Sequence, residues 1–376
     1  MTGLELAERF YRDAVAPLLG DERHAAALLG DGSEVLGYDD IVSTDHNFGP
    51  RLQVFLGDAA DPEPMSARLQ RELPEHFEGV PVRFSSADRY GGQPHHQVEV
   101  TTAGRFFAQR LTVDPVDGLS LAGWLLTPTQ IFATLTAGAV FHDPHAELGR
   151  RREALAWFPE DVWRYVLAAA WLRIGQEEAF IGRAGGAGDD RGSRIVAARL
   201  VRELVRLTFL IERRWAPYSK WLGRAFTELA LAPRLGPHLD AAMAADGWRQ
   251  REAAVCAAAS IAGAATNELG LAEPVDPTPR RFYERDVTVV GADRFTAALT
   301  AAITDPPVIA LLRRLGHRRG VDVGSLPGAI DQAIDSTDVL CHPARCRAAA
   351  ASLGLVDDGT PMTNTDKLHG SGTVSA

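Results

Sequence analysis

The first 150 residues contain short runs in which apolar and polar positions alternate, a pattern typical of strands. RLQVFLG (residues 51–57) and HQVEVTT (residues 96–102) have the branched, period-two composition of half-buried strands. Between them, PMSARLQRELPEHF has the period of a helix, and the Gly- and Pro-rich stretches GDAADPEP and YGGQP break the pattern. This order of elements predicts a small α/β layer.

Near Pro159 the pattern changes to long segments with a 3.6-residue period. These are EDVWRYVLAAAWLRIGQEEAFIGR, GSRIVAARLVRELVRLTFLIERRWAP, YSKWLGRAFTELAL and WRQREAAVCAAASIAGAATNELGL. Such periods predict a helical bundle. Asp189 and Asp190 suit the N-cap region of one helix, and Pro217 separates two helices. RDVTVVGADRFTAALTAAITD predicts one further strand and helix.

We therefore predict an α+β fold with two domains: a small mixed sheet with helices in residues 1–150, and a mostly helical bundle domain in residues 151–355. The chain has 376 residues, which suits two domains at ~100–200 residues each. Residues 356–376 are polar and rich in Gly, Ser and Thr, so we predict a disordered tail.

Composition limits the function. The chain is 46% hydrophobic and 23% charged, as in ordinary globular proteins, and its net charge is -10. Sequence-independent nucleic-acid binding depends on patches of lysine and arginine that neutralise phosphates, so the acidic balance argues against a nucleic-acid partner. Any phosphate group that the chain binds must be held by a local arrangement.

Features of the sequence also predict the compartment. The N-terminal segment MTGLELAERFYRDAVAPLL carries acidic residues through a helical pattern and lacks the basic, apolar and small-residue order of a signal peptide. No apolar run reaches the length of a membrane span, and three cysteines fit a reducing environment. We expect a cytoplasmic protein with no membrane partner.

One stretch, GSEVLGYDDIVSTDHNFG, combines a Gly-Ser turn with oxygen ligands. Asp45 and Asn47 would point to the same side of a strand end, and Mg²⁺ prefers one or two carboxylates together with phosphate oxygens. Gly32 lets the backbone approach a phosphate closely, and the Ser33 hydroxyl can bind its oxygens. Glu99, on the later predicted strand, could bind a metal or deprotonate an attacking hydroxyl.

These residues resemble the signature of the DNA polymerase beta-like nucleotidyltransferase superfamily: a Gly-Ser pair, a spacer, Asp-x-[Asp/Glu] and an acidic residue on a later strand. The matching positions are Gly32, Ser33, Asp45, Asn47 and Glu99. Longer phrases resemble a bacterial domain-of-unknown-function branch of that superfamily over about residues 1–355. They are GSEVLGYDDIVSTDHNFGPRLQVFL, GSRIVAARLVRELVRLTFLIERRWAPYSKWLGRAF and DQAIDSTDVL.

The resemblance implies a two-domain enzyme like the kanamycin and lincosamide nucleotidyltransferases, with a nucleotidyltransferase-like α/β domain and a helical domain. It implies Mg²⁺-dependent transfer of a nucleoside monophosphate from a nucleoside triphosphate to a small-molecule acceptor. Gly32 and Ser33 would bind phosphates. Asp45, Asn47 and Glu99 would bind metal, and Asp45 and Glu99 would be the catalytic residues.

Asn47 departs from the family pattern, which has a carboxylate at this position. An amide oxygen is a neutral ligand, so weaker metal binding is expected. Two alternatives therefore stay open: a binding module with a degenerate metal site, or a repurposed enzyme acting on a small metabolite in a biosynthetic pathway. The acidic residues Glu34, Asp39 and Asp40 are expected in a solvated connecting turn.

In the helical part, ERRWAPYSKW places basic and aromatic residues around a helix break. Tyr218 and Lys220 are predicted triphosphate contacts, because the resemblance runs through them. The alternative is a solvated basic helix end, where the helix dipole favours cations. The sequence identifies neither the nucleotide nor the acceptor, and both a monomer and a homodimer are compatible with it.

Overall fold

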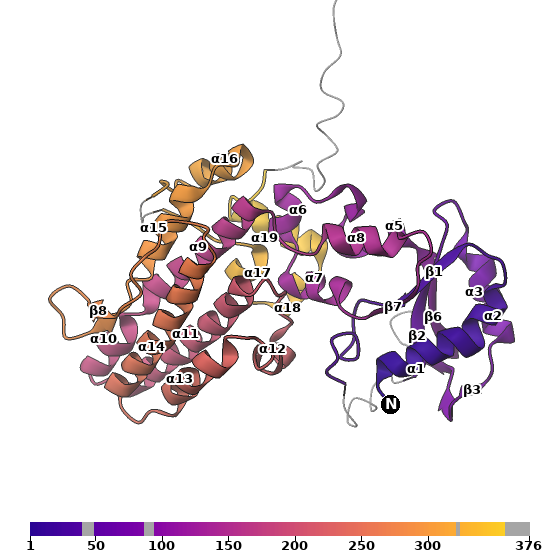
Figure 1. Cartoon of the computed structure of the whole chain (residues 1–376), viewed down its shortest axis with the longest axis horizontal. Helices are drawn as coiled ribbons and strands as arrows, with labels where there is room; N and C mark the ends of the chain where they lie inside the picture. Colours follow the sequence, from indigo (N-terminus) through magenta and orange to yellow (C-terminus); the bar gives the residue numbers. More distant parts are fainter. Residues whose placement is uncertain (40–48, 86–93, 321–323, 358–376) are drawn as a thin grey trace, which may run out of the picture. The chain divides into compact units, whose positions relative to one another are not determined.

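The computed structural model describes residues 1–39, 49–85, 94–320 and 324–357. They form an α+β fold, in which a mixed five-stranded sheet with helices is followed by a mostly helical region (Figure 1). The predicted fold class is therefore confirmed. Asp45, Asn47 and most of the predicted tail lie outside the described residues.

The chain divides into two compact units. Among the described residues, the first comprises Met1–Ser120 and Ile131–Ala156, and the second comprises Leu121–Gln130 and the chain from Trp157 to Asp357. The change of unit after Ala156 lies close to the predicted boundary at residue 150. The segment Leu121–Gln130 precedes that boundary yet belongs to the second unit.

The first unit contains the sheet, whose strand order is β5-β6-β2-β1-β7. Its strands are β1 His24–Leu28, β2 Arg51–Leu56, β5 Arg83–Ser85, β6 Pro94–Thr102 and β7 Ala139–His142. Strands β2 and β6 are parallel, and the other neighbouring pairs are antiparallel. The two strands predicted from the alternating runs are confirmed as β2 and β6.

Helices flank this sheet, and several begin at capping residues. The elements are α1 Gly3–Phe10, a π-helical turn Tyr11–Val15, α2 Ala16–Leu19, α3 Pro62–Glu72, α5 Ala103–Leu111, a 3-10 turn Pro115–Asp117, α7 Thr129–Thr136, α8 Glu147–Ala154, and the hairpin of β3 His76–Phe77 and β4 Val80–Pro81. Thr2 and Glu5 form a capping box at α1. The Thr102 hydroxyl accepts the Arg105 N–H at 3.3 Å, so α5 starts directly where β6 ends.

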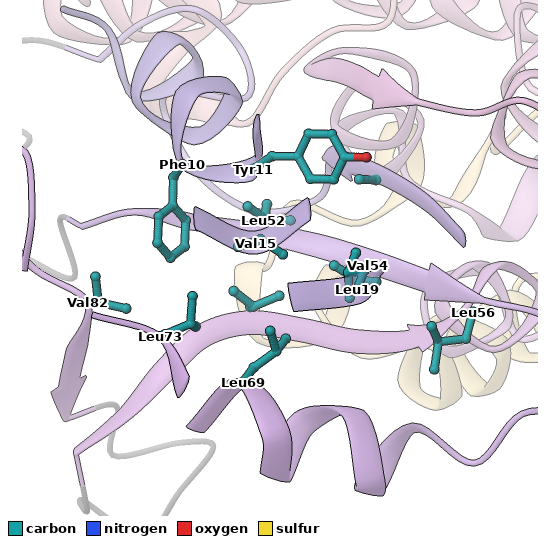
Figure 2. Close-up of a cluster of buried hydrophobic side chains, with 12 residues drawn as sticks. Phe10, Tyr11, Val15, Leu19, Leu52, Val54, Leu56, Leu69, Leu73 and Val82 are labelled. Atoms are coloured by element: carbon teal, nitrogen blue, oxygen red, sulfur yellow. The ribbon is translucent and has the colours of Figure 1, made fainter. Parts of the chain in front are cut away.

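The two faces of β2 have different neighbours. Leu52, Val54 and Leu56 point to one face, where they pack against side chains of the N-terminal helical segments and of α3 (Figure 2). Phe55 points to the opposite face, and its ring lies 5.2 Å from that of Phe106 in α5. Because successive strand residues alternate between faces, Gln53 lies on the same face as Phe55.

The second unit is built mainly of helices. They are α6 Leu121–Leu126, α9 Glu160–Glu177, α10 Phe180–Gly186, α11 Asp190–Ile211, α12 Ser219–Phe226, α13 Ala232–Ala244, α14 Trp248–Glu268, α15 Asp293–Ala302, α16 Pro306–Arg314, α17 Ile330–Ala333, α18 Thr337–Leu340 and α19 Pro343–Ser352, with the hairpin of β8 Arg280–Arg281 and β9 Thr288–Val289. Helix α11 packs against both α9 and α14 (Figure 1). Asp189 caps α11 by accepting the Gly192 N–H at 2.8 Å, as predicted. Within the described ranges, no helix combines the length and the apolar character that a membrane crossing needs.

His96, near the start of β6, is fully buried. Its Nδ1 atom accepts the Val98 N–H at 3.2 Å, so Nε2 carries the proton and donates to the Ser66 carbonyl oxygen at 3.0 Å. Burial lowers the pKa of His96 to about 4, because the charged imidazole would lose its hydration. His96 is therefore held as a neutral side chain.

This lowered pKa predicts a pH dependence of stability. Between pH 6.5 and about 4 the unfolded chain binds a proton at His96 that the folded chain does not bind. The free energy of unfolding should therefore fall as the pH drops through this window, by roughly 3 kcal/mol. Denaturation at a series of pH values, monitored by hydrogen exchange of the β6 peptide, measures this free energy. His96→Gln should remove the part of its pH dependence between pH 6.5 and about 4. An NMR titration that placed the pKa of His96 near 6.5 would contradict the prediction.

Candidate functional site

A glycine-rich turn follows β1 in the first unit. Gly30 has φ of 86° and Gly32 has φ of 137°, values in the region that favours glycine. The Gly30 N–H donates to the Thr134 carbonyl oxygen at 2.9 Å, which fixes the start of the turn. Within the described residues, the N–H groups of Asp31 and Gly32 form no hydrogen bond.

Gln53 joins this turn to the sheet. It lies on β2, is 5% exposed, and its Oε1 atom accepts the Leu29 N–H at 2.9 Å. In the parallel pairing of β2 with β6, Gln53 is the register partner of Glu99. Register partners lie on the same face of a sheet, so Glu99 lies beside Gln53 on the face that α5 covers.

Arg110, in the last turn of α5, connects Glu99 with the turn. Its Nη2 atom lies 3.8 Å from a Glu99 carboxylate oxygen, and its guanidinium carbon lies 3.7 Å above the centre of the Phe106 ring. A Cβ atom placed on Gly30 would lie 3.4 Å from Arg110 Nε. The guanidinium therefore lies against both the backbone of the turn and the predicted catalytic carboxylate.

A second arginine lies against the same turn. Arg51, the first residue of β2, donates from Nε to Glu34 Oε1 at 2.5 Å, and its Nη2 atom also donates to the Asp31 carbonyl oxygen. A Cβ atom on Gly32 would collide with Arg51 Nη2. Glu34, which was expected in a solvated turn, is instead a partly buried member of an ion pair.

Two of the predicted site features are linked indirectly in the structure. Glu99 on β6 reaches Gly30 of the turn through Arg110, and within the turn the Ser33 carbonyl oxygen accepts the Tyr38 N–H at 2.9 Å. The proposed metal ligands Asp45 and Asn47 lie outside the described residues. Among the described residues, no group of three His, Cys, Asp or Glu side chains is placed to hold a metal ion.

Tyr218 and Lys220 lie in the second unit, at the start of α12. The Tyr218 carbonyl oxygen accepts the Trp221 N–H at 3.0 Å, and Lys220 Nζ lies 4.7 Å from the centre of the Trp221 ring. Lys220 is exposed and Tyr218 is half-buried. Their contact with a triphosphate stays a prediction.

A hollow of about 250 Å³ lies beside Glu99 along the edge of β6. It is lined by Asp61, Pro62, Glu63, Glu99, Val100, Thr101, Arg105 and Gln109. The lining is mostly polar and comes from β6, α5 and the start of α3. A small polar molecule in this hollow would touch Glu99.

Comparisons with known proteins give one match. A family model described as a domain of unknown function (DUF4037) matches residues 124–222, about a quarter of the chain. The matched stretch contains Tyr218 and Lys220 but not the glycine-rich turn, Arg51 or Glu99. No curated protein and no solved structure matches the chain.

Arg51 and Arg110 were not found from the sequence. Arg51 opens a strand directly after Gly49 and Pro50, and Arg110 follows Phe106 by one helical turn; neither spacing is distinctive. Their importance comes from strand register and from the crossing of α5 over the sheet. The feature that marks both residues is an arginine side chain close in space to the Gly-Ser turn. The sequence does not show this closeness, because it arises only when the chain folds.

The turn geometry predicts different effects for two glycine substitutions. Gly32→Ala and Gly37→Ala should each strain the backbone by about 1–3 kcal/mol, since both residues have positive φ. Of the two, Gly32→Ala adds collisions with the side-chain ends of Arg51 and Glu34, whereas a Cβ on Gly37 meets open space. Because these flexible side-chain ends can shift only by disturbing their ion pair, Gly32→Ala should lower the free energy of unfolding by a further ~1 kcal/mol. Denaturation monitored by hydrogen exchange of β1 and β2 peptides measures the free energy of unfolding of both variants. Equal decreases in Gly32→Ala and Gly37→Ala would refute this placement of Arg51.

Proposed function

We propose that the chain is a metal-dependent nucleotidyltransferase, which moves a nucleoside monophosphate from a nucleoside triphosphate to a small-molecule acceptor. The observation that carries this proposal is the link from the Gly30–Ser33 turn through Arg110 to Glu99. Through Arg110, the carboxylate of the family-like motif is connected with the turn that contains its Gly-Ser pair, although the two are far apart in sequence. The resemblance of the longer phrases supports the same function.

In this reaction an acceptor oxygen attacks the α-phosphorus in line with the bond to the β-phosphate. The new bond joins the acceptor oxygen to the α-phosphorus, the bridging bond breaks, and pyrophosphate leaves with the electron pair. The turn, with Ser33, would hold the terminal phosphates through backbone N–H and hydroxyl groups. Glu99 would take the acceptor proton or bind metal.

Asp45 and Asn47 would hold Mg²⁺, which supplies charge neutralisation to the triphosphate when bound. The hollow beside Glu99 is a suitable place for the acceptor, because a molecule there would lie next to the proposed base. We further propose that the acceptor is a small molecule handled in the cytoplasm.

One observation favours a second candidate, a nucleotide-binding module that does not transfer. Arg110 lies 3.8 Å from Glu99, so it partly neutralises a carboxylate that a metal site would need. Asn47 removes a further negative charge. In this second candidate Arg51 and Arg110 would supply the positive charge for phosphate binding, and Mg²⁺ would add little.

Calorimetric titration with each of the four nucleoside triphosphates, with and without Mg²⁺, tests the proposal. We expect one triphosphate to bind in the presence of Mg²⁺, and Asp45→Ala to weaken that binding at least ~10-fold. Asp21→Ala is the matched control, because Asp21 is an exposed carboxylate of the same unit that lies before β1, outside the turn. Asn47→Asp should raise pyrophosphate release in an acceptor screen.

Two results would separate the candidates. Binding that is equally tight with Mg²⁺ or with a chelator, and unchanged by Asp45→Ala, would favour the module without transfer. Failure of all four triphosphates to bind under either condition would exclude both candidates.

A further inference from the structure

Arg51 holds an unusual position for a residue that opens a strand. Its guanidinium lies directly against the glycine-rich turn, since a Cβ on Gly32 would collide with Nη2. The side chain is 27% exposed and is therefore within reach of solvent. Glu34 and the Asp31 carbonyl oxygen hold it there.

The hydrogen bonds of Arg51 leave donors unused. A guanidinium has five N–H groups, and Glu34 and Asp31 engage only Nε and Nη2. Within the described part of the chain, Nη1 forms no hydrogen bond, and neither do the backbone N–H groups of Asp31 and Gly32. Unused guanidinium and backbone donors next to each other favour a phosphate group.

The partner that Arg51 already has is chemically similar to a phosphate. One oxygen of the Glu34 carboxylate, Oε1, accepts from Nε at 2.5 Å and lies 2.5 Å from Nη2. A phosphate that used the full fork of the guanidinium would need the same N–H groups. Arg110 and Glu99 form a second ion pair beside Gly30 of the same turn, so these four charges cancel without a ligand.

We propose that Arg51 binds a phosphate group at the Gly30–Ser33 turn and that Glu34 is an intramolecular competitor for the same guanidinium. This inference rests on the proposed function, because the phosphate group that Arg51 binds would be part of the nucleoside triphosphate. Glu34 must release Arg51 for the phosphate to bind. The carboxylate therefore weakens phosphate binding and holds Arg51 over the turn between binding events.

Inorganic tripolyphosphate is the probe that isolates this step from nucleoside recognition, and calorimetry on the full chain gives its Kd. We expect Arg51→Gln to weaken binding at least ~10-fold, because a charged hydrogen-bonding group is lost. Glu34→Gln should tighten binding ~3-fold to ~10-fold, because the amide competes less well than the carboxylate. The double variant should bind as weakly as Arg51→Gln alone.

The control is a matched ion pair of the same unit. Arg68 and Glu72, at 3.2 Å in α3, are both exposed and lie outside the turn. Arg68→Gln and Glu72→Gln should leave the Kd unchanged, which separates the specific effect from a change of net charge. Circular dichroism of each variant checks folding, and the double variant retains a neutral hydrogen-bonding pair.

The outcomes distinguish this inference from the proposed function. If a nucleoside triphosphate binds with Mg²⁺ and Asp45 but Glu34→Gln does not tighten the binding of either ligand, the competition is wrong and the proposed function stands. In a different outcome, the variants change the Kd of tripolyphosphate in the predicted order while no nucleoside triphosphate binds more tightly than tripolyphosphate. In that case the anion site is supported and the proposed nucleotidyl transfer is contradicted. Absence of tripolyphosphate binding in the wild type and in Glu34→Gln overturns the inference.

Discussion

The candidate site depends on the register of the parallel pair β2 and β6. This register places Glu99 beside Gln53, whose amide holds the Leu29 N–H at the start of the glycine-rich turn. A shift by one residue would move Glu99 to the opposite face, where Leu52 and Val54 form the core. Burial of the apolar face therefore also fixes which residues lie on the polar face. The same register determines both the packing of the core and the position of Glu99 in the candidate site.

Charge is balanced at this end of the sheet. Two arginines lie against a turn with unused backbone donors, and each arginine is paired with a glutamate. Pairing avoids the cost of partly burying lone charges, yet it also means that an incoming phosphate must displace a carboxylate. Such a site binds an anion by exchanging partners, so its affinity depends on how firmly Glu34 holds Arg51.

Sequence patterns predict the elements better than the site. The branched alternation of β2 and β6 and the long helical periods of α9 and α11 are local, and the structure confirms them. The alanine-rich β1 has little intrinsic strand preference, and its pairing depends on its neighbours. The Arg51–Glu34 pair joins residues on either side of a long connection, and α5 must cross the sheet before Arg110 can reach Glu99. These contacts follow from tertiary structure, which a motif does not encode.

The most direct test of phosphate binding at the turn is a crystal structure of the chain with Mn²⁺ and a non-hydrolysable analogue of the triphosphate that binds best. The account predicts phosphate oxygens within hydrogen-bond distance of the Gly32 N–H and of Arg51, with Glu34 released from the guanidinium. A triphosphate bound elsewhere, while the Arg51–Glu34 pair stays intact, would contradict it.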